Sequence, residues 1–306
     1  MTTPLNRGAD LPADVGLAEP PPNFARRIWL RWAWGELRRA PPTAWFGLII
    51  VLIYVLVALF APLIAPHAET EIVGAAYEAT GKQFILGTDQ LGRDMLSRLI
   101  YGARNTIGIA FVTTILAFLM GGALGILTSV LRGWVDQVLG RFVDVLMAIP
   151  QLIFALMLLS IVGASVVNLI LIMAVLDSTR VFRLSRAVAM NVAVMDYVEA
   201  ARLQGEKLGW IMSHEILPNI LPPLLAEFGL RFCFVFLTIS ALSFLGIGIQ
   251  PPAADWGSMV RENATLITYG DIKPLLPAGA IALLTVAVNF VVDWFLNKTS
   301  GLKDER

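Results

Sequence analysis

The stretch YVEAARLQGEKLGWIMSHEILPN, residues 197–219, is charged and lies between two long apolar segments. Its residues up to Gln204 mostly favour a helix. Gly205 is expected to end or bend that helix, because glycine readily adopts the left-handed conformation found at helix ends. Leu217 precedes Pro218, a pairing that is expected to close a second helix. One apolar stripe along that second helix is formed by Leu208, Ile211, Met212 and Ile216.

The composition of the whole chain indicates a membrane protein with several spans. Of its 306 residues, 57% are hydrophobic and 15% are charged, whereas soluble domains contain roughly 25% charged residues. The formal net charge of +0 gives no basic patch that would suggest a nucleic-acid partner. Cys233 is the single cysteine, so an internal disulfide is excluded. His67 and His214 stand far apart without partners at ligand spacing, and we therefore expect no metal site.

Six windows of the sequence are apolar and long enough to cross a bilayer, and in lipid each must be a helix. They cover residues 44–65, 106–131, 142–162, 165–182, 220–248 and 275–297. Lys and Arg are concentrated on the side that holds both termini and residues 180–207. By the positive-inside rule, this side is expected to be cytoplasmic.

Three stretches together resemble a known family. EAARLQG at 199–205, followed after ten residues by ILPN, resembles the EAA motif of the membrane subunits of ABC importers. LGTDQLGRDMLSRLIYGAR (86–104) and ALSFLGIGIQPPAADWGSM (241–259) resemble one branch, the dipeptide/oligopeptide/nickel importer permeases. Within that branch the chain is similar to the second of two paired permeases, the C type. The likeness extends over about residues 44–297.

The resemblance implies an all-α polytopic membrane protein with six transmembrane helices and a cytoplasmic coupling helix. The expected organisation is a cytoplasmic tail and interfacial segment at 1–43, a first transmembrane helix at 44–65, a periplasmic loop at 66–104, a five-helix permease core at 105–297 that includes the coupling helix at 197–218, and a cytoplasmic C-terminus at 298–306. The residues alone are also compatible with an amphipathic linker on the membrane surface at 197–218.

The coupling helix of this family docks on a cytoplasmic ATPase subunit. The resemblance carries that role to Glu199, Ala200, Ala201 and Gly205, with Leu217 and Pro218 closing the segment.

At the external side, the resemblance suggests two groups of contacts. Asp89, Arg93 and Asp94 are candidates for contact with a substrate-binding protein, or they simply belong to an interfacial helix, with Thr88 and Asp89 as good helix N-caps. Gln250 and Trp256 are expected near the entrance gate, with Trp256 at the membrane interface.

Three charges inside the expected spans depart from the family pattern. Glu227 and Arg231 are four residues apart, a spacing that permits an intrahelical ion pair. Ionisable groups at membrane depth usually face protein or water. Glu227, Arg231 and Asp177 therefore either satisfy each other locally or line the translocation pore.

The function implied is that of one permease subunit of a binding-protein-dependent importer in the bacterial cytoplasmic (inner) membrane. Its expected partners are a homologous second permease, two cytoplasmic ATPase subunits, a periplasmic or lipid-anchored binding protein and membrane lipid. The chain has no G-x-x-x-x-G-K-[ST], so ATP and Mg are expected on the partner ATPases, with no cofactor and no enzymatic activity on this chain.

Di- and oligopeptides are the leading substrates, with nickel chelates, opines and oligosaccharides as alternatives. A stand-alone secondary transporter is a rival from another class, which would need its own ion-coupling groups. A membrane enzyme is a further rival, for which we find no catalytic constellation.

Overall fold

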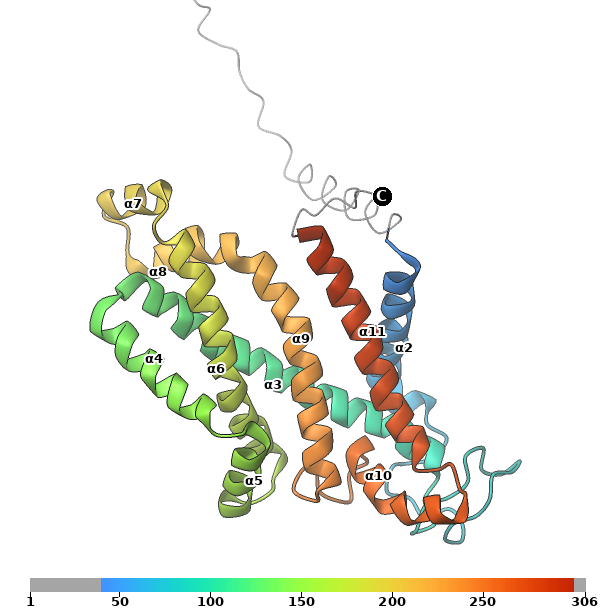
Figure 1. Ribbon diagram of the computed structural model, residues 1–306. Coiled ribbons are helices and arrows are strands. Elements are labelled where there is room, and N and C mark those ends of the chain that lie inside the picture. Colours follow the sequence, from blue (N-terminus) through green and yellow to red (C-terminus); the bar gives the residue numbers. More distant parts are fainter. Residues whose placement is uncertain (1–39, 300–306) are drawn as a thin grey trace, which may run out of the picture. The chain divides into compact units, whose positions relative to one another are not determined.

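The computed structural model of the chain describes residues 40–299. The expected interfacial segment at the N-terminus and nearly all of the C-terminal tail lie outside these residues. The described part is built from helices, with two isolated β-bridges, Ile72 with Arg93 and Thr88 with Asp94. The helices in chain order are α2 (Pro42–Ile64), α3 (Met95–Leu131), α4 (Gly133–Ala148), α5 (Gln151–Val162), α6 (Val166–Val192), α7 (Asp196–Leu203), α8 (Leu208–Trp210), the π-helix η1 (Ile211–Ile216), α9 (Leu217–Phe244), α10 (Trp256–Asn263), the 3₁₀ helix η2 (Ala264–Tyr269) and α11 (Leu275–Thr299) (Figure 1).

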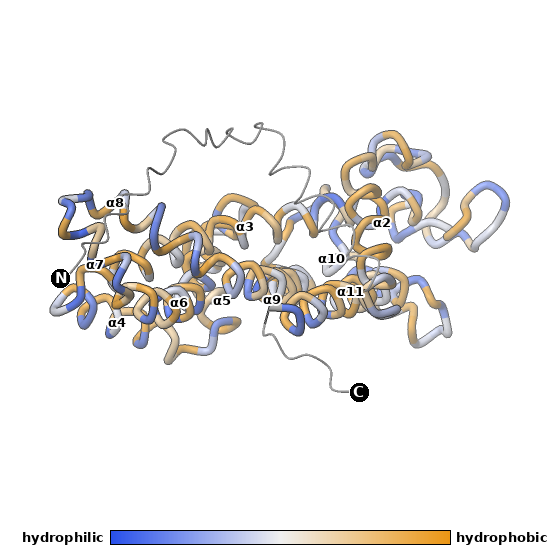
Figure 2. The backbone as a smooth tube through the Cα atoms, turned by 90° about the horizontal axis from the view of Figure 1, so that it is seen from above, coloured by the Kyte–Doolittle hydropathy of each residue, from blue (hydrophilic) through white to orange (hydrophobic). Residues whose placement is uncertain are grey.

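Within the described residues, four helices are long and apolar enough to cross a membrane: α2, α3, the continuous helix 208–244 and α11. Figure 2 shows these helices as predominantly hydrophobic along their length. The bent pair α4–α5 would add a fifth span. α6 does not meet the same standard, because Asp177, Arg180 and Arg183 interrupt its apolar sequence. Length and composition thus support four or five of the six predicted spans.

The single helix predicted over 142–162 is wrong, because α4 and α5 meet at an 89° bend. Pro150 lacks a backbone N–H and disfavours helical geometry at the residue before it. Ile149 accordingly has extended backbone angles, φ −88° and ψ 130°. The bend places Gln151, the first residue of α5, beside α6.

α3 begins at Met95, well before the predicted window at 106. Asp94 is its N-cap, and the Asp94 carboxylate accepts a hydrogen bond from the Ser97 backbone N–H at 2.9 Å. The expectation that Thr88 or Asp89 caps this helix is therefore wrong. Polar residues of the first turns did not prevent helix formation, because several of them, such as Ser97 and Arg98, are buried within the protein.

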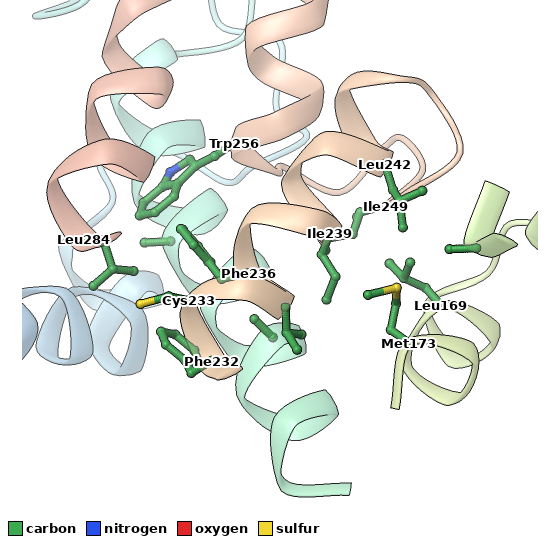
Figure 3. Close-up of a cluster of buried hydrophobic side chains, with 14 of the residues drawn as sticks. Leu169, Met173, Phe232, Cys233, Phe236, Ile239, Leu242, Ile249, Trp256 and Leu284 are labelled. Atoms are coloured by element: carbon green, nitrogen blue, oxygen red, sulfur yellow. The ribbon is translucent and has the colours of Figure 1, made fainter. Parts of the chain in front are cut away.

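The main hydrophobic core surrounds α9 (Figure 3). Phe236 and Ile239 of α9 are fully buried there, and Trp256 of α10 closes the core at one end. The Trp256 ring makes edge contacts with Tyr54 and Phe236, and its Nε1–H donates to the Leu99 carbonyl at 2.9 Å. With 2% of its surface exposed, Trp256 is a core residue.

A seam of small residues joins α3 to α6, the most extensive helix pairing in the described chain. A Cβ atom added at Gly121 would overlap the Ser178 carbonyl oxygen and lie 2.9 Å from the Phe182 nitrogen. One added at Gly125 would lie 2.7 Å from the Phe182 carbonyl oxygen. Glycine is therefore required at both positions for the two backbones to approach this closely.

Candidate functional site

The candidate coupling segment, residues 197–218, has its predicted turn at Gly205. α7 ends at Leu203, and Gly205 has φ +84°, a conformation that favours glycine. A Cβ atom at Gly205 would meet nothing within 4 Å. The requirement for glycine here is thus one of backbone conformation and not of space.

Pro218 does not close the second helix of this segment, as the sequence had suggested. α8, η1 and α9 run on without interruption from Leu208 to Phe244. In η1 the hydrogen bonds reach back five residues, so the Leu217 N–H donates to the Met212 carbonyl. Pro218 lies in the first turn of α9, directly after this π-helical turn, and its missing N–H does not end the continuous helix.

One side of the coupling segment is anchored in a second buried cluster. Val198 and Ala201 of α7 pack there with Ile211 and Ile216 of the following helix. The opposite side is exposed: Glu199, Ala200, Arg202 and Leu203 face away from the cluster, and Leu203 is 83% exposed. Of the EAA residues, Ala201 therefore belongs to the core, whereas Glu199 and Ala200 remain available to a partner.

At the opposite end of the described chain (Figure 1), the loop before α3 is joined to α10 by a buried ion network. Asp89 accepts from the Arg93 Nε at 2.7 Å and from Arg98. Glu262 of α10 accepts from the Arg98 Nη1 at 2.9 Å and lies 3.5 Å from the Arg93 Nη2. Two carboxylates thus balance two guanidinium groups.

Burial by itself raises the pKa of Asp89, but hydrogen bonds from the Arg93 and Leu91 backbone and the charges of Arg98 and Arg93 outweigh it and lower that pKa below its usual value. Asp89, Arg93 and Asp94 are 0%, 4% and 3% exposed. Their side chains are consequently not available in this conformation for the predicted contact with a binding protein. Sequence reasoning missed Glu262, which is far from these residues along the chain.

Further polar contacts join residues of the same α10 end. Buried Lys273 donates from its Nζ to the Glu78 carbonyl at 2.9 Å. The Asn105 amide donates to the Ala254 carbonyl at 2.8 Å. Gln250, a predicted gate residue, is exposed and donates to the Gly246 and Gly248 carbonyls at 3.1 and 3.0 Å, so it serves the turn after α9.

The three charges that the sequence singled out within its expected spans lie near one another on α6 and α9. The Arg231 Nε and the Glu227 Oε1 are 2.6 Å apart, which gives the predicted ion pair. Asp177 lies on α6, which packs against α9. Asp177 accepts a hydrogen bond from Gln151 of α5 at 2.8 Å, a partner that sequence reasoning missed although a glutamine beside a proline inside an apolar segment is a visible signal.

Comparison with known proteins agrees with this architecture. Residues 121–298 match the family model described as binding-protein-dependent transport system inner membrane component. Residues 29–79 match that described as the N-terminal TM domain of oligopeptide transport permease C. The dipeptide transport system permease protein DppC of Haemophilus influenzae is 32% identical over 295 residues, which cover 94% of this chain and 97% of that one. The di/tripeptide transport system permease protein DppC of Pseudomonas aeruginosa is 34% identical, covering 84% of this chain and 85% of that one.

A solved structure is similar in fold. The crystal structure of an amino acid ABC transporter with histidines has a TM-score of 0.51 and 19% sequence identity, and the match covers 66% of this chain and 94% of that chain. At this identity the likeness concerns the fold alone. The family model and the permease relatives go further: the chain belongs to the family of binding-protein-dependent transport system inner membrane components and is a permease subunit of an ABC importer.

Proposed function

We propose that this chain forms one half of the translocation pore of an ABC importer for di- and oligopeptides. The peptide cargo is supported by relatives whose names specify dipeptides and di/tripeptides, at 32% and 34% identity over most of the chain. The observation that carries the mechanical part is the coupling segment, because it is anchored on one side and exposed on the other. The other half of the pore would come from a homologous permease.

The exposed side of α7 is the surface offered to a cytoplasmic ATPase. Glu199 and Arg202 supply charges of both signs, and Leu203 supplies an apolar side chain. A shallow pocket of about 320 Å³ lies among these residues and Arg132. Mixed charge around an exposed apolar side chain suits a protein partner better than the acyl region of a bilayer. This end, with both termini, would be cytoplasmic, and ATP with Mg would be held by the ATPases.

Transmission then follows the continuous helix from Leu208 to Phe244. Movement of α7 on ATP binding would displace this helix as a unit, because Val198 and Ala201 of α7 pack against Ile211 and Ile216 at its start. In the assembled importer the bent pair α4–α5 and α6 would complete the six spans. The binding protein would dock at the opposite, α10 end, on residues other than the buried Asp89, Arg93 and Asp94.

Reconstitution tests this proposal. The chain, its partner permease and the two ATPases are purified together and placed in liposomes with the cognate binding protein. We expect uptake of labelled dipeptide that requires ATP and binding protein, and competition by unlabelled dipeptide but not by a nickel chelate, an opine or an oligosaccharide. Uptake by this chain alone, driven by an ion gradient, would instead establish a secondary transporter.

A further inference from the structure

The turn between α3 and α4 holds an arginine in a backbone conformation that suits glycine. Arg132 has φ +49° and ψ −169°, and the next residue, Gly133, has φ +65°. A residue with a Cβ atom is strained in this conformation, and such strain is found where a side chain is needed for function. The Arg132 side chain is exposed, and it makes no hydrogen bond or ion pair within residues 40–299. The fold of the described chain therefore gives no reason for an arginine at this turn.

Arg132 lines the pocket beside α7, which has a volume of about 320 Å³. Three segments that are distant along the chain form this pocket: the α3–α4 turn, the end of α6 and α7. The other lining residues are Ala193, Val194, Glu199, Arg202 and Leu203. Ala193 is 5% exposed, whereas Glu199, Arg202 and Leu203 are exposed. Arg132 thus lies next to the proposed ATPase surface, although it is outside the EAA segment.

The charges around this pocket are not balanced. Arg132 and Arg202 contribute two cations and Glu199 one anion, and none of the three forms an ion pair within the described residues. One guanidinium group therefore has no counter-charge, and a carboxylate is a group that guanidinium binds with two parallel hydrogen bonds. Leu203, which is 83% exposed, adds an apolar side chain. Apolar surface among charges of both signs favours a protein partner, since anionic membranes attract clusters of cations.

We propose that Arg132 and Arg202 together bind a carboxylate side chain of the ATPase subunit, so that the α3–α4 turn is part of the docking surface. The inference rests on the proposed function and deepens it, because it names the chemistry of the partner's contact. It also gives the ATPase a second point of attachment. Arg132 directly follows α3, which packs closely on α6 at Gly121 and Gly125. An ATPase bound at both α7 and this turn would move the α3–α6 pair together with α9.

The test measures how fast the ATPase dissociates from the complete importer in lipid nanodiscs. Fluorescent ATPase in the complex is exchanged against an excess of unlabelled ATPase, at low and at high salt. Because loss of a charged hydrogen bond corresponds to about a 10-fold change, we expect Arg132→Gln to raise the dissociation rate by about that factor at low salt and by less at high salt. Arg132→Lys keeps the cation and should dissociate more slowly than Arg132→Gln. Arg104→Gln, at an exposed arginine near the other end of α3, should leave the rate unchanged.

Arg132→Gly separates the role of the side chain from that of the turn. This variant loses the charge but is relieved of the strain, so it should release the ATPase as fast as Arg132→Gln and have a higher Tm. A wild-type dissociation rate in either variant, or a lower Tm in Arg132→Gly than in Arg132→Gln, would overturn the inference. An effect seen only with anionic lipid would also overturn it, by assigning Arg132 to the membrane surface. These outcomes leave peptide uptake by the wild-type importer intact, whereas a purified complex without any ATPase would refute the proposed function itself.

Discussion

Replacing Arg98 with methionine tests the buried ion network at the α10 end. Arg98 is 1% exposed and bridges Asp89 of the loop before α3 to Glu262 of α10. Methionine keeps much of the side-chain volume but removes the charge. Arg93 then faces two carboxylates alone, one of them at 3.5 Å, and the buried group acquires a net charge of about −1.

The size of the effect follows from the geometry. At the 2.9 Å separation of Arg98 and Glu262, two unit charges attract by about 6 kcal/mol for an effective dielectric constant of about 20. Relief of the desolvation of Arg98 offsets part of this, and breaking a buried pair costs about 3–5 kcal/mol net. At about 2–4 °C per kcal/mol, the expected fall in Tm is roughly 6–20 °C.

The assay is thermal unfolding of the purified importer in detergent, followed by the loss of the monodisperse peak. Arg104→Met, at an exposed arginine of the same helix, is the matched control and should shift the Tm by less than about 2 °C. The double variant Arg98→Met with Glu262→Gln leaves Arg93 and Asp89 as a neutral pair. It should recover about 1–3 kcal/mol relative to the sum of the single effects. Purely additive losses would refute the argument from charge balance.

Three further predictions concern backbone conformation, helix packing and pH. Gly205→Val should abolish ATP-driven uptake while the complex still assembles. Gly205→Asn should retain much of the uptake, because asparagine tolerates the φ of +84° at this position. Equal uptake by the two variants would show that the turn is dispensable. Gly121→Ala should destabilise the subunit by about 1–3 kcal/mol in thermal unfolding. Gly122→Ala, whose Cβ would meet only the Ser185 Oγ at 4.0 Å, should be neutral or stabilising. A loosely packed α3–α6 seam would not produce this difference in stability between the two variants. The pKa of Asp89 is lowered in the folded protein, so the stability that Asp89 contributes is complete above the unfolded pKa of about 3.9 and is lost as the pH falls through the folded pKa. With respect to this group, the Tm should therefore be constant from about pH 7 to 5. Below about pH 4 the Tm should fall, and it should fall less in Asp89→Asn.

Sequence reasoning succeeded where a local signal determined the structure. Apolar length placed α2 and α11 within about two residues of their observed bounds, because lipid permits only helices there. The conformation at Gly205 followed from the chemistry of glycine.

The failures occurred where tertiary contacts overrode a local signal. Pro218 was read as a helix end, yet the π-helical turn before it absorbs the missing hydrogen bond and α9 continues. The burial of Trp256 by the rings of Tyr54 and Phe236 and by the Leu99 carbonyl was not visible in the sequence. No local pattern reveals such partners, since they come from helices far apart along the chain.

The π-helix η1 also has a consequence for rotation. A π turn accommodates one residue more than an α-helical turn, and in an α-helix each residue advances the chain by about 100° around the axis. The wide turn at Ile211–Ile216 therefore sets the azimuth of α7 about the axis of α9. Deleting one residue there, so that the turn closes as an ordinary α-helix, would leave the span in place and point Glu199 and Leu203 in a different direction. The number of residues between Gly205 and Pro218, independently of their identity, therefore sets the direction of the surface that we propose faces the ATPase.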